Sequence, residues 1–498
     1  MPDIFSYGTP ESVGLRSADM EAMFRELEKR RFGSHGLLVA RGGRIVAEGY
    51  FSPFDKDTFH RMYSTSKSFA ATAIGCLMDE GRIRPDDKIL KFFPEKERPD
   101  MHPWVRNMTV DDLLTMRTCF SGGNTYSSHR DDWVDSFFTT APDHPSGTYF
   151  NYDTSGSFIL DVIVERLTGQ KYLDYLKDKC LRDCGFSEDA WCVESPDGYS
   201  WGGSGVQCTL RDLARLGQLY LNGGRAGGKQ LLSEAFVRAA TQEQVDNNTE
   251  GHLDLLNGQG YGYQIWCLPD GCFAFRGMGG QVCLCSPDTG FLLAAISDEQ
   301  GGACGYQLLA DLFFRYLVWP AAEGRIPARL PEDEAACRHL REHTAHLSLT
   351  LSILGETASP RAADFVGKTY HMDENSMGIE RFRLDMEGTT GTFRFFARGE
   401  EKTIPFGLGT YVAHRFPETS YSGRRIRTPK GEGYKSLSAA LWTEPRKLVL
   451  RTLVVDDYFG NLTVTFAFRD REVSLFMQKT AEWFLDEYQG LGVGHTDE

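Results

Sequence analysis

The sequence predicts an α+β fold followed by an all-β domain, and three observations lead to this prediction. Runs rich in Val, Ile and Leu form a β-hairpin pattern at residues 35–51, and short β-type runs recur over residues 261–298. Helix-like segments fill the chain between these two regions, which is typical of an antiparallel sheet flanked by helices. Beyond residue 361 the pattern changes to short strands with turn residues between them, as in a barrel or sandwich.

The length of the chain supports two bodies of unequal size. The chain has 498 residues, which is about three times the ~150 residues of a typical domain. We therefore expect a large α+β domain over residues 1–325, a helical linker over residues 326–360, and a lipocalin-like β-barrel domain over residues 361–498.

The first elements follow from local patterns. A helix-like stretch covers residues 17–30, and Gly42-Gly43 separates the two strands of the hairpin as a tight turn. Over residues 64–80 the chain is apolar almost all round, and it ends at Gly81, a helix C-cap signal. This pattern predicts a buried helix.

The remaining elements complete both domains. Helical periodicity at residues 306–319 predicts a helix that covers the sheet, and residues 331–346 predict one amphipathic helix in the linker. The other helix-like segments lie at residues 109–117, 155–168, 169–181 and 209–221. The strand-like runs of the last domain lie at residues 382–387, 390–397, 448–455, 461–470 and 472–478.

Composition argues against some classes of partner. The net charge of −15 disfavours nucleic acid and anionic membrane, because both attract basic surface. The first residues lack the basic and apolar regions of a secretory signal, and no later stretch reaches the ~18 apolar residues of a membrane span. The twelve cysteines are scattered and form no Cys-x-x-Cys pair, which favours reduced thiols. We expect a cytoplasmic protein, and a homo-oligomer is left open.

The strongest chemical signal is the segment RMYSTSKSF at residues 61–69. Ser64 and Lys67 are three residues apart, so on a helix they are neighbours on one face. A serine hydroxyl is a poor nucleophile until a base contacts it, and burial lowers the pKa of a lysine toward the range of a base. Because Ser-x-x-Lys by itself is a weak motif, the interpretation depends on further segments.

Two further segments support a catalytic site. Residues 145–154 read PSGTYFNYDT and place Tyr152 on a loop that leads into a helix. Residues 274–281 read AFRGMGGQ, a strand that runs into glycines, where a backbone can approach a ligand closely.

Together these segments resemble the serine β-lactamase and penicillin-binding-protein superfamily, specifically its class C-like branch of β-lactamases, esterases, D-aminopeptidases and amide hydrolases. The resemblance covers residues 8–320, and it also rests on TVDDLLTMRT at residues 109–118 and GGSGVQCTLRDLARLGQLYLNGG at residues 202–224. It implies a class C β-lactamase-like fold, with an antiparallel sheet, flanking helices and a helical subdomain.

The resemblance also implies a serine hydrolase that works through an acyl-enzyme. Ser64 would attack an acyl carbon, and Lys67 and Tyr152 would share the removal and return of protons; which of the two takes the proton from Ser64 stays open. The backbone N–H groups of Ser64 and Gln281 would bind the oxyanion, with Gly280 as a neighbouring alternative for the second donor.

Two departures from the family pattern bear on the substrate. Thr154 stands where β-lactamases of this branch have asparagine, and Met278-Gly279-Gly280 stands where they have Lys-Thr-Gly. The missing cation is the one expected to meet the carboxylate of a β-lactam, which argues against strong penicillinase activity. Arg276 lies two residues earlier on the same face of the strand and could supply charge, although a solvated rim arginine is the simpler interpretation.

We therefore expect a small-molecule substrate that is an ester, a linear amide or a short peptide, D-amino-acid peptides included. The candidate substrate-binding residues are Thr154, Trp201, Arg276, Met278, Gly279 and Gly280. For Trp201, packing in the core is an equally good explanation.

Other functions remain open. A β-lactamase or a D,D-peptidase would use the same three side chains, and a catalytically silent ligand sensor or scaffold would keep the fold without turnover. No cofactor or metal is expected: His339, His343 and His346 on the predicted linker helix are typical of a polar helix face.

Overall fold

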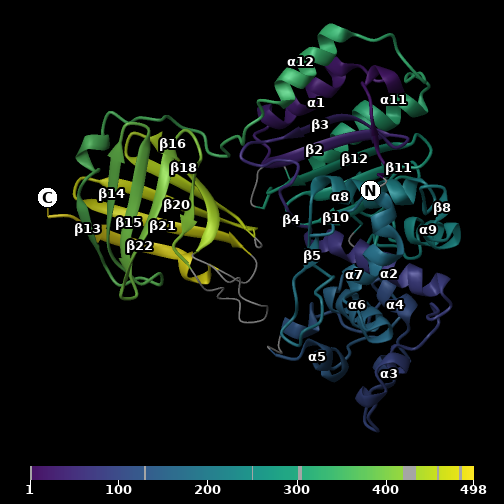
Figure 1. Ribbon diagram of the computed structural model, residues 1–498. Coiled ribbons are helices and arrows are strands. Elements are labelled where there is room, and N and C mark those ends of the chain that lie inside the picture. Colours follow the sequence, from purple (N-terminus) through teal and green to yellow (C-terminus); the bar gives the residue numbers. More distant parts are fainter. Residues whose placement is uncertain are drawn as a thin grey trace.

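The computed structural model describes residues 3–127, 131–249, 251–300, 305–418, 433–456, 459–481 and 485–497. It shows a large α+β domain and a β-barrel domain beside it, with the chain passing from one to the other after helix α12 (Figure 1).

A seven-stranded sheet forms the centre of the large domain, in the order β1-β3-β2-β12-β11-β10-β9. Its strands are β1 (Ser6–Tyr7), β2 (Ser34–Arg41), β3 (Arg44–Tyr50), β9 (Trp266–Cys267), β10 (Phe273–Gly277), β11 (Gln281–Ser286) and β12 (Phe291–Ser297). Neighbouring strands are antiparallel except β1, which runs parallel to β3. The sheet thus joins the N-terminal hairpin to strands from the other end of the domain.

The turn of the N-terminal hairpin requires glycine. Gly42 and Gly43 have φ values of 55° and 75°, in the left-handed region that residues with a side chain rarely adopt. Two successive residues with positive φ give a turn whose twist matches that of the strands. The predicted hairpin is therefore present, with its turn at the predicted place.

Side-chain alternation along the strands divides the core of this domain into two layers. The helices that cover the sheet are α1 (Ser17–Lys29), α2 (Ser66–Asp79), α8 (Leu210–Leu221), α10 (Gln307–Phe313), α11 (Trp319–Ala322) and α12 (Glu334–Thr344). On β2, Leu37 and Val39 belong to the core that contains residues of α1, α10 and α12. Leu38 and Ala40 belong to the other core, with α2 and α8. Because successive residues of a strand face opposite sides, a strand covered on both sides is apolar throughout.

A helical subdomain lies between β3 and β9 along the chain. Its helices are α3 (Pro103–Asn107), α4 (Val110–Leu114), α5 (Trp133–Thr139), α6 (Thr154–Thr168), α7 (Tyr172–Leu176) and α9 (Glu234–Thr241). Its short strands are β4 (His60–Arg61), β5 (Trp191–Cys192), β6 (Val206–Cys208), β7 (Arg225–Ala226) and β8 (Lys229–Gln230). Helix α2 contacts α6 and α7, and every residue from Ser66 to Leu77 is buried, as the apolar pattern predicts.

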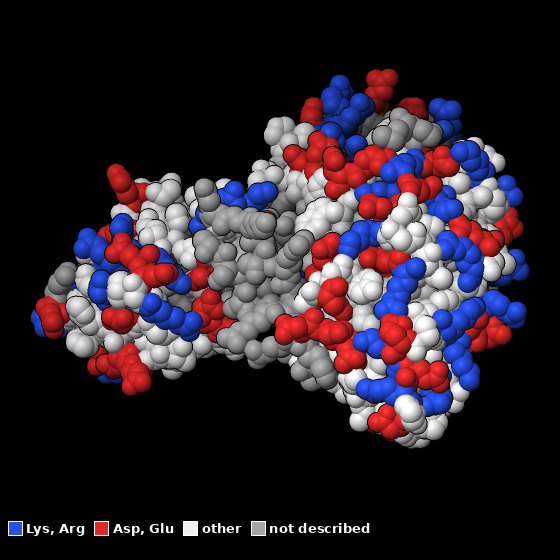
Figure 2. Space-filling view, turned by 60° about the horizontal axis from the view of Figure 1, so that its bottom comes forward, with Lys and Arg blue, Asp and Glu red and all other residues white. Residues whose placement is uncertain are grey.

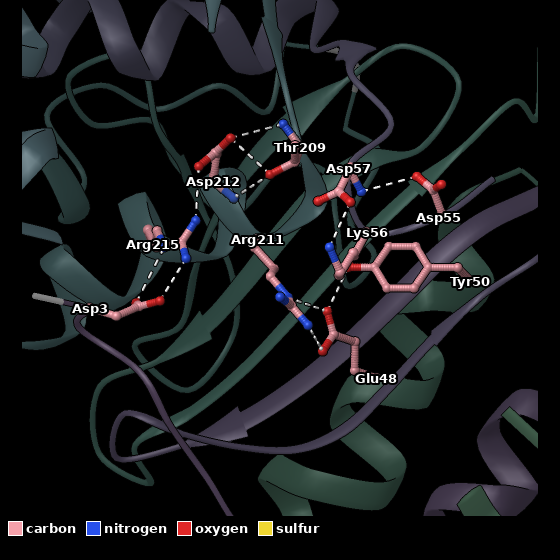
Figure 3. Close-up of polar contacts among 10 residues, drawn as sticks. All are labelled: Asp3, Glu48, Tyr50, Asp55, Lys56, Asp57, Thr209, Arg211, Asp212 and Arg215. Atoms are coloured by element: carbon pink, nitrogen blue, oxygen red, sulfur yellow. Dashed lines mark hydrogen bonds and ion pairs between the residues drawn. The ribbon is translucent and has the colours of Figure 1, made fainter. Parts of the chain in front are cut away.

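Ion pairs fix helix α8 against the sheet (Figure 3). Arg211 forms a bidentate pair with Glu48 of β3, with distances of 2.7 Å and 2.8 Å. Arg215 bonds Asp3 at 2.6 Å and Asp212 at 3.0 Å. Bidentate arginine–carboxylate pairs have a fixed orientation, so these contacts set the direction of the helix as well as its place.

The linker helix α12 packs on the large domain. His343 Nε2 lies 2.8 Å from Glu28 Oε2 on α1, and His346 Nδ1 lies 2.7 Å from the carbonyl oxygen of Glu342. His343 on this helix and His346 just after it thus make polar contacts, and His339 is exposed.

The C-terminal domain is a closed barrel. Its strands are β13 (Thr369–Met372), β14 (Ile379–Glu387), β15 (Thr390–Ala397), β16 (Glu400–Leu408), β17 (Val412–Phe416), β18 (Tyr434–Glu444), β19 (Lys447–Val455), β20 (Phe459–Arg469), β21 (Glu472–Ala481) and β22 (Gly490–His495). Their order is β16-β15-β14-β13-β22-β21-β20-β19-β18-β17, and β16 also pairs with β18. That additional pairing closes the barrel.

Aromatic rings fill the barrel. Phe365 stacks on Phe468 with ring centroids 4.5 Å apart, and Phe393 lies 5.0 Å from Phe466. All four side chains are buried. The interior is therefore a packed core.

The surface carries charges of both signs. On the face shown in Figure 2, Lys and Arg are interspersed with Asp and Glu over the described residues. The described cysteines are free thiols, and nearly all of them are buried. Within the described ranges, no helix combines the length and the apolar character needed to cross a membrane.

The predicted fold class is confirmed, but individual elements differ: the barrel strands β13, β16, β17, β18 and β22, for example, lie outside the five predicted strand-like runs. The helix predicted from residue 64 begins as a 3₁₀ turn, Tyr63–Thr65, before α2. The helix predicted over residues 306–319 is α10 followed by a π-helical turn, Phe314–Val318, and by α11. Strand β1 is not predicted because a two-residue strand leaves no periodic pattern. The domain boundaries stay predictions.

Candidate active site

Ser64 lies where the chain enters the buried helix α2. It is the middle residue of the 3₁₀ turn and is partly exposed, whereas both of its neighbours are buried. The hydroxyl of Thr65 donates to the carbonyl of Gln281 at 2.9 Å, which ties the turn to β11. Tyr63 has a φ of 46°, which is uncommon for a residue with a bulky side chain. The turn therefore holds an accessible hydroxyl between two fixed neighbours.

Lys67 contacts that hydroxyl from the first turn of α2. Its side chain is buried, with 1% of the residue exposed. Nζ donates to Ser64 Oγ at 3.1 Å and to the carbonyl of Gly203 at 2.6 Å. The predicted neighbour relation of residues 64 and 67 is therefore present, and a buried amine in contact with a hydroxyl can exchange a proton with it.

Tyr152 approaches the same pair from the helical subdomain. Lys67 Nζ lies 5.0 Å from the centroid of its ring, and its phenol interacts with the side chain of Ser64. The ring stacks on Trp266 at a centroid distance of 5.4 Å. Burial raises the pKa of Tyr152 to about 12, while the hydrogen bond with Ser64 and the charge of Arg276 lower it. At neutral pH the phenol therefore holds its proton.

A capped helix end fixes the position of Tyr152. The next residue, Asp153, is the N-cap of α6, and its Oδ1 accepts the N–H of Ser155 at 2.8 Å. Its Oδ2 accepts the hydroxyl of Thr118 at 2.9 Å. Burial raises the pKa of Asp153, and these hydrogen bonds oppose that rise. Because a cap of this kind anchors the backbone at the helix start, Tyr152 has little freedom to move.

The turn Met278–Gly280 joins β10 to β11 beside the active-site turn. Gly277 pairs with Gln281 across the hairpin, and the carbonyl of Gly277 accepts the N–H of Gly280 at 3.2 Å. The C=O and N–H of one trans peptide point in opposite directions, so the N–H of Met278 points away from β11. Met278 is also 38% exposed. The backbone N–H of Met278 is therefore the one that this turn presents outward.

Gln281 faces the interior of the sheet. It is 1% exposed, and its Nε2 donates to the carbonyl of Ser297 at 2.7 Å and to that of Met278 at 3.1 Å. Its own carbonyl accepts the hydroxyl of Thr65. These contacts give the side chain and the carbonyl of Gln281 a structural role.

Gly277 brings β10 close to the turn that carries Ser64. A Cβ at this position would lie 2.2 Å from the carbonyl oxygen of Met62 and 3.0 Å from the hydroxyl of Thr65. The distance between the added Cβ and the carbonyl oxygen is far shorter than a methyl group tolerates. The close approach of the two backbones therefore requires glycine.

Arg276 is buried on β10, with 7% of the residue exposed, so a solvated rim position is wrong for it. Its guanidinium lies 4.4 Å from the centroid of the Trp266 ring. It donates to the carbonyl of Leu256, to Asn257 Oδ1 at 3.3 Å and to the hydroxyl of Tyr306 at 3.2 Å. Its charge therefore already has partners, and it anchors the segment that contains residues 256 and 257.

Thr154 lies beside the Lys67 contact. Its N–H donates to Asn124 Oδ1 at 3.1 Å. Its methyl carbon would be 2.5 Å from a Cβ added at Gly203, the residue whose carbonyl accepts the lysine. Thr154 thus packs against the segment that holds the amine in place.

Trp201 packs in the core of the subdomain. It is 1% exposed, its ring lies 4.7 Å from the guanidinium carbon of Arg61, and its centroid lies 5.4 Å from that of Trp133. The structure therefore corrects the alternative in which Trp201 lines the pocket.

Two groups of this site are not predicted from the sequence. The carbonyl of Gly203 is a backbone group, and no residue type marks a backbone acceptor. Trp266 lies in a strand-like run, where the sequence favours packing in the core for an aromatic residue. Only the folded chain shows that Trp266 stacks on Tyr152.

Among the described residues, one group has the spacing of metal ligands, and it lies at the start of α1. Ligand atoms of Glu11, Glu332 and Cys337 are within 4.8 Å of one another. Glu11 accepts the N–H of Ser17 at 2.7 Å and its hydroxyl at 2.9 Å, and the thiol of Cys337 donates to Glu11. Hydrogen bonds that hold the helix start therefore already occupy these atoms.

Comparison with known proteins places the chain in a family. The family model described as Beta-lactamase matches residues 20–310, more than half of the chain. The chain therefore belongs to the Beta-lactamase family, and the predicted superfamily is confirmed. This membership defines a serine hydrolase at the level of the family.

Individual relatives agree with this assignment. The chain is 28% identical over 310 residues to the 6-aminohexanoate-dimer hydrolase of Paenarthrobacter ureafaciens, covering 58% of this chain and 79% of that protein. It is 25% identical over 307 residues to penicillin-binding protein 4 of Amycolatopsis lactamdurans, covering 54% and 79%. The solved structure of EstCE1, a hydrolase with promiscuous acyltransferase activity, shares the fold at a TM-score of 0.50 and 14% identity, covering 60% of this chain and 99% of that chain.

Proposed function

We propose that this protein cleaves an amide or ester bond through an acyl-enzyme formed on Ser64. The observation that carries the proposal is that two proton-transfer groups meet at one accessible hydroxyl. Lys67 Nζ lies 3.1 Å from Ser64 Oγ, and the phenol of Tyr152 interacts with the same side chain. A serine with two such partners can lose its proton as it attacks.

The pKa of Tyr152 favours different roles for Lys67 and Tyr152 in proton transfer. In acylation, Ser64 Oγ forms a bond to the acyl carbon while its proton passes to the neutral amine of Lys67. Because burial raises the pKa of Tyr152 to about 12, the phenol is protonated and donates to the leaving amine or alcohol as the C–N or C–O bond breaks. The ammonium of Lys67 then returns a proton to Tyr152.

Deacylation follows the same path in reverse. A water oxygen forms a bond to the acyl carbon as its proton passes to Tyr152, whose own proton moves to the amine of Lys67, and the bond to Ser64 Oγ breaks as that oxygen takes the proton from the Lys67 ammonium. The acid is released, and the three side chains return to their starting protonation states.

The oxyanion of both steps needs two donors. The first is the backbone N–H of Ser64. For the second we propose the N–H of Met278 in place of that of Gln281, because the Gly277–Met278 peptide turns its carbonyl toward Gly280 and its N–H outward.

A linear amide or ester is the substrate class that these residues support best. The charge of Arg276, which could meet the carboxylate of a β-lactam, is already engaged by protein groups. The stacked rings of Tyr152 and Trp266 offer apolar surface to an extended chain. The relative named as a hydrolase of the 6-aminohexanoate dimer supports a linear amide.

Labelling with a fluorophosphonate tests the proposal. We expect covalent modification of Ser64, located by peptide mass analysis, and loss of the label in Ser64→Ala. An unlabelled wild-type protein would instead support a silent ligand sensor or scaffold.

A substrate panel tests the class of bond. We expect p-nitrophenyl esters, D-amino-acid amides or the linear 6-aminohexanoate dimer to be hydrolysed faster than nitrocefin. Nitrocefin turned over far faster than every ester and amide would overturn the preference for linear substrates and favour a β-lactamase.

A further inference from the structure

The end of β12 and the segment after it, residues 297–300, hold the turn Met278–Gly280 in place. The hydroxyl of Ser297 donates to the carbonyls of Gly279 at 2.7 Å and Gly280 at 3.0 Å. The N–H of Glu299 donates to the carbonyl of Gly279 at 3.0 Å. Three hydrogen bonds thus fix the turn that carries the proposed oxyanion donor.

The 297–300 segment also reaches the other side of the active site. Nε2 of Gln300 donates to the hydroxyl of Tyr63 at 3.4 Å. Tyr63 is 1% exposed, has a φ of 46° and directly precedes Ser64. Because an uncommon backbone conformation persists only where the surroundings hold it, this contact bears on the position of the nucleophile.

The barrel domain binds the same segment through polar groups. Asn461 on β20 is 1% exposed, and its Nδ2 donates to the carbonyl of Gln300 at 3.1 Å. Asp298 is 7% exposed at the same junction. Burial raises the pKa of Asp298 to about 6, while the charge of Arg451 on β19 and hydrogen bonds with Asn461 and Gln300 lower it. These buried polar contacts can form only when the barrel is docked.

Apolar packing keeps the two domains in contact beside this junction. Phe54 of the large domain forms one buried cluster with Leu437 of β18 and Leu453 of β19. This cluster does not include the 297–300 segment. Its apolar contacts and the polar junction can therefore be tested separately.

We propose that the barrel domain is part of the catalytic architecture, with Asn461 as a positioning residue for the active site. By holding the carbonyl of Gln300 it fixes the 297–300 segment. That segment in turn fixes both the Met278 turn and Tyr63. This inference rests on the proposed function, because it assigns the barrel a role in the same hydrolysis.

The test is steady-state kinetics of Asn461→Ala in the full-length chain, on the best ester or amide of the panel. We expect kcat to fall about tenfold or more with KM changed less than about twofold, because a small misplacement of groups that act only in the transition state lowers kcat. Asn461→Gln keeps the amide donor and should recover part of the lost kcat. A double-mutant cycle with Tyr63→Phe should be non-additive, because both side chains act through Gln300.

Thr452→Val is the matched control. Thr452 is buried on β19, and its hydroxyl hydrogen-bonds Ser438 at 2.7 Å inside the barrel. This variant should lower the melting temperature of the protein and leave kcat within about twofold of wild type, in line with the loss of one buried hydrogen bond. Thermal unfolding of every variant separates a loss of fold from a loss of positioning, and Asn461→Asp replaces Asn461→Ala if the latter does not fold.

The two proposals fail separately. If Asn461→Ala or its replacement is folded, is labelled at Ser64 like wild type and keeps wild-type kcat, the positioning role is overturned and the hydrolase remains. If Ser64→Ala is labelled as fast as wild type, the proposed nucleophile itself is overturned.

Discussion

At the scale of single residues, the candidate site depends on one local pair and one distant partner. Ser64 and Lys67 are neighbours because they are three residues apart on the same turn of chain. Tyr152 joins them only through the packing of α6 against α2. Because the three groups act on one proton, removing either Lys67 or Tyr152 should lower kcat nearly as much as removing both.

Lys67→Met and Tyr152→Phe test this site at the same scale. We expect each to lower kcat by about 10²-fold to 10⁴-fold, the usual contribution of a positioned acid or base, with the fold retained. Stopped-flow or steady-state ester hydrolysis gives the rate, and circular dichroism gives the fold.

Lys177→Met is the matched control for Lys67→Met. Lys177 is also buried, and its Nζ donates to the carbonyls of Glu188 at 2.7 Å and Ala190 at 2.6 Å, as Lys67 does to Gly203. The Lys177→Met variant should be less stable than wild type without a specific loss of kcat. Equal losses of kcat in the two lysine variants would contradict a catalytic role for Lys67.

At the scale of elements, the β10–β11 hairpin and the turn before α2 form one unit. Gly277 lets the strand reach the backbone of Met62, and Thr65 bonds the first residue of β11. The distance between the two proposed oxyanion donors is therefore fixed by a close approach of two backbone segments and by a buried hydrogen bond from a hydroxyl to a carbonyl. Groups held in this way need no reorganisation during reaction.

Gly277→Ala should break this unit. The added methyl would lie 2.2 Å from a carbonyl oxygen that cannot move alone, so β10 and the Ser64 turn must separate. We expect a fall in kcat of about 10²-fold, the size of losing one oxyanion donor, together with a lower melting temperature.

Gly122→Ala is the control for this change. Gly122 has no atoms within 4 Å of an added Cβ and no positive φ, so the substitution should leave both kcat and melting temperature near wild type. Wild-type kinetics in Gly277→Ala would refute the idea that this approach sets the site.

At the scale of the whole molecule, a buried histidine pair lies next to the contact between the domains. His60 Nε2 lies 3.0 Å from His35 Nδ1, and both residues are fully buried. The ring of Phe54 stacks on His35 at 3.8 Å and also packs against Leu437 of the barrel. The charge state of this pair therefore bears on how the domains are held together.

Acid should destabilise the protein through this pair. Burial lowers the pKa of His60 to about 4, and burial together with the neighbouring His60 lowers the pKa of His35 well below its usual value. An unfolded chain binds these protons near pH ~6.5, whereas the native state does not, so stability is fully present above about pH 6.5 and is lost on going down toward pH 4.

Melting temperatures between pH 7.5 and pH 4.5, measured for wild type and His60→Gln, check this prediction. The variant should lose less stability on acidification than wild type, whatever its stability at pH 7.5. His252→Gln, which removes an exposed histidine, should keep the wild-type slope. A wild-type slope in His60→Gln would show that the pair does not set the acid response.

Local patterns predict much of this molecule. The glycine pair at 42–43, the all-round apolar run of α2 and the alternating strands of the barrel each specify an element by periodicity or turn chemistry. The resemblance to a known family identifies Ser64, Lys67 and Tyr152 as candidate catalytic residues, because it connects distant segments of the chain. The spacing of these residues in the sequence does not connect them by itself. Arg276 is not placed correctly, and Trp201 is left between core and pocket, since a sequence does not show which charged or aromatic side chains neighbouring elements will bury.

The order of apolar, polar and turn residues along this chain determined where helices and strands form, and it put the serine and lysine one turn apart. Folding decided which backbone carbonyl receives the amine, which peptide N–H faces outward, and that a barrel strand binds the segment behind the nucleophile. The physical reason is that elements arise from contacts between near neighbours in sequence. Those later choices depend on contacts between residues far apart in sequence, which exist only once the two domains have packed.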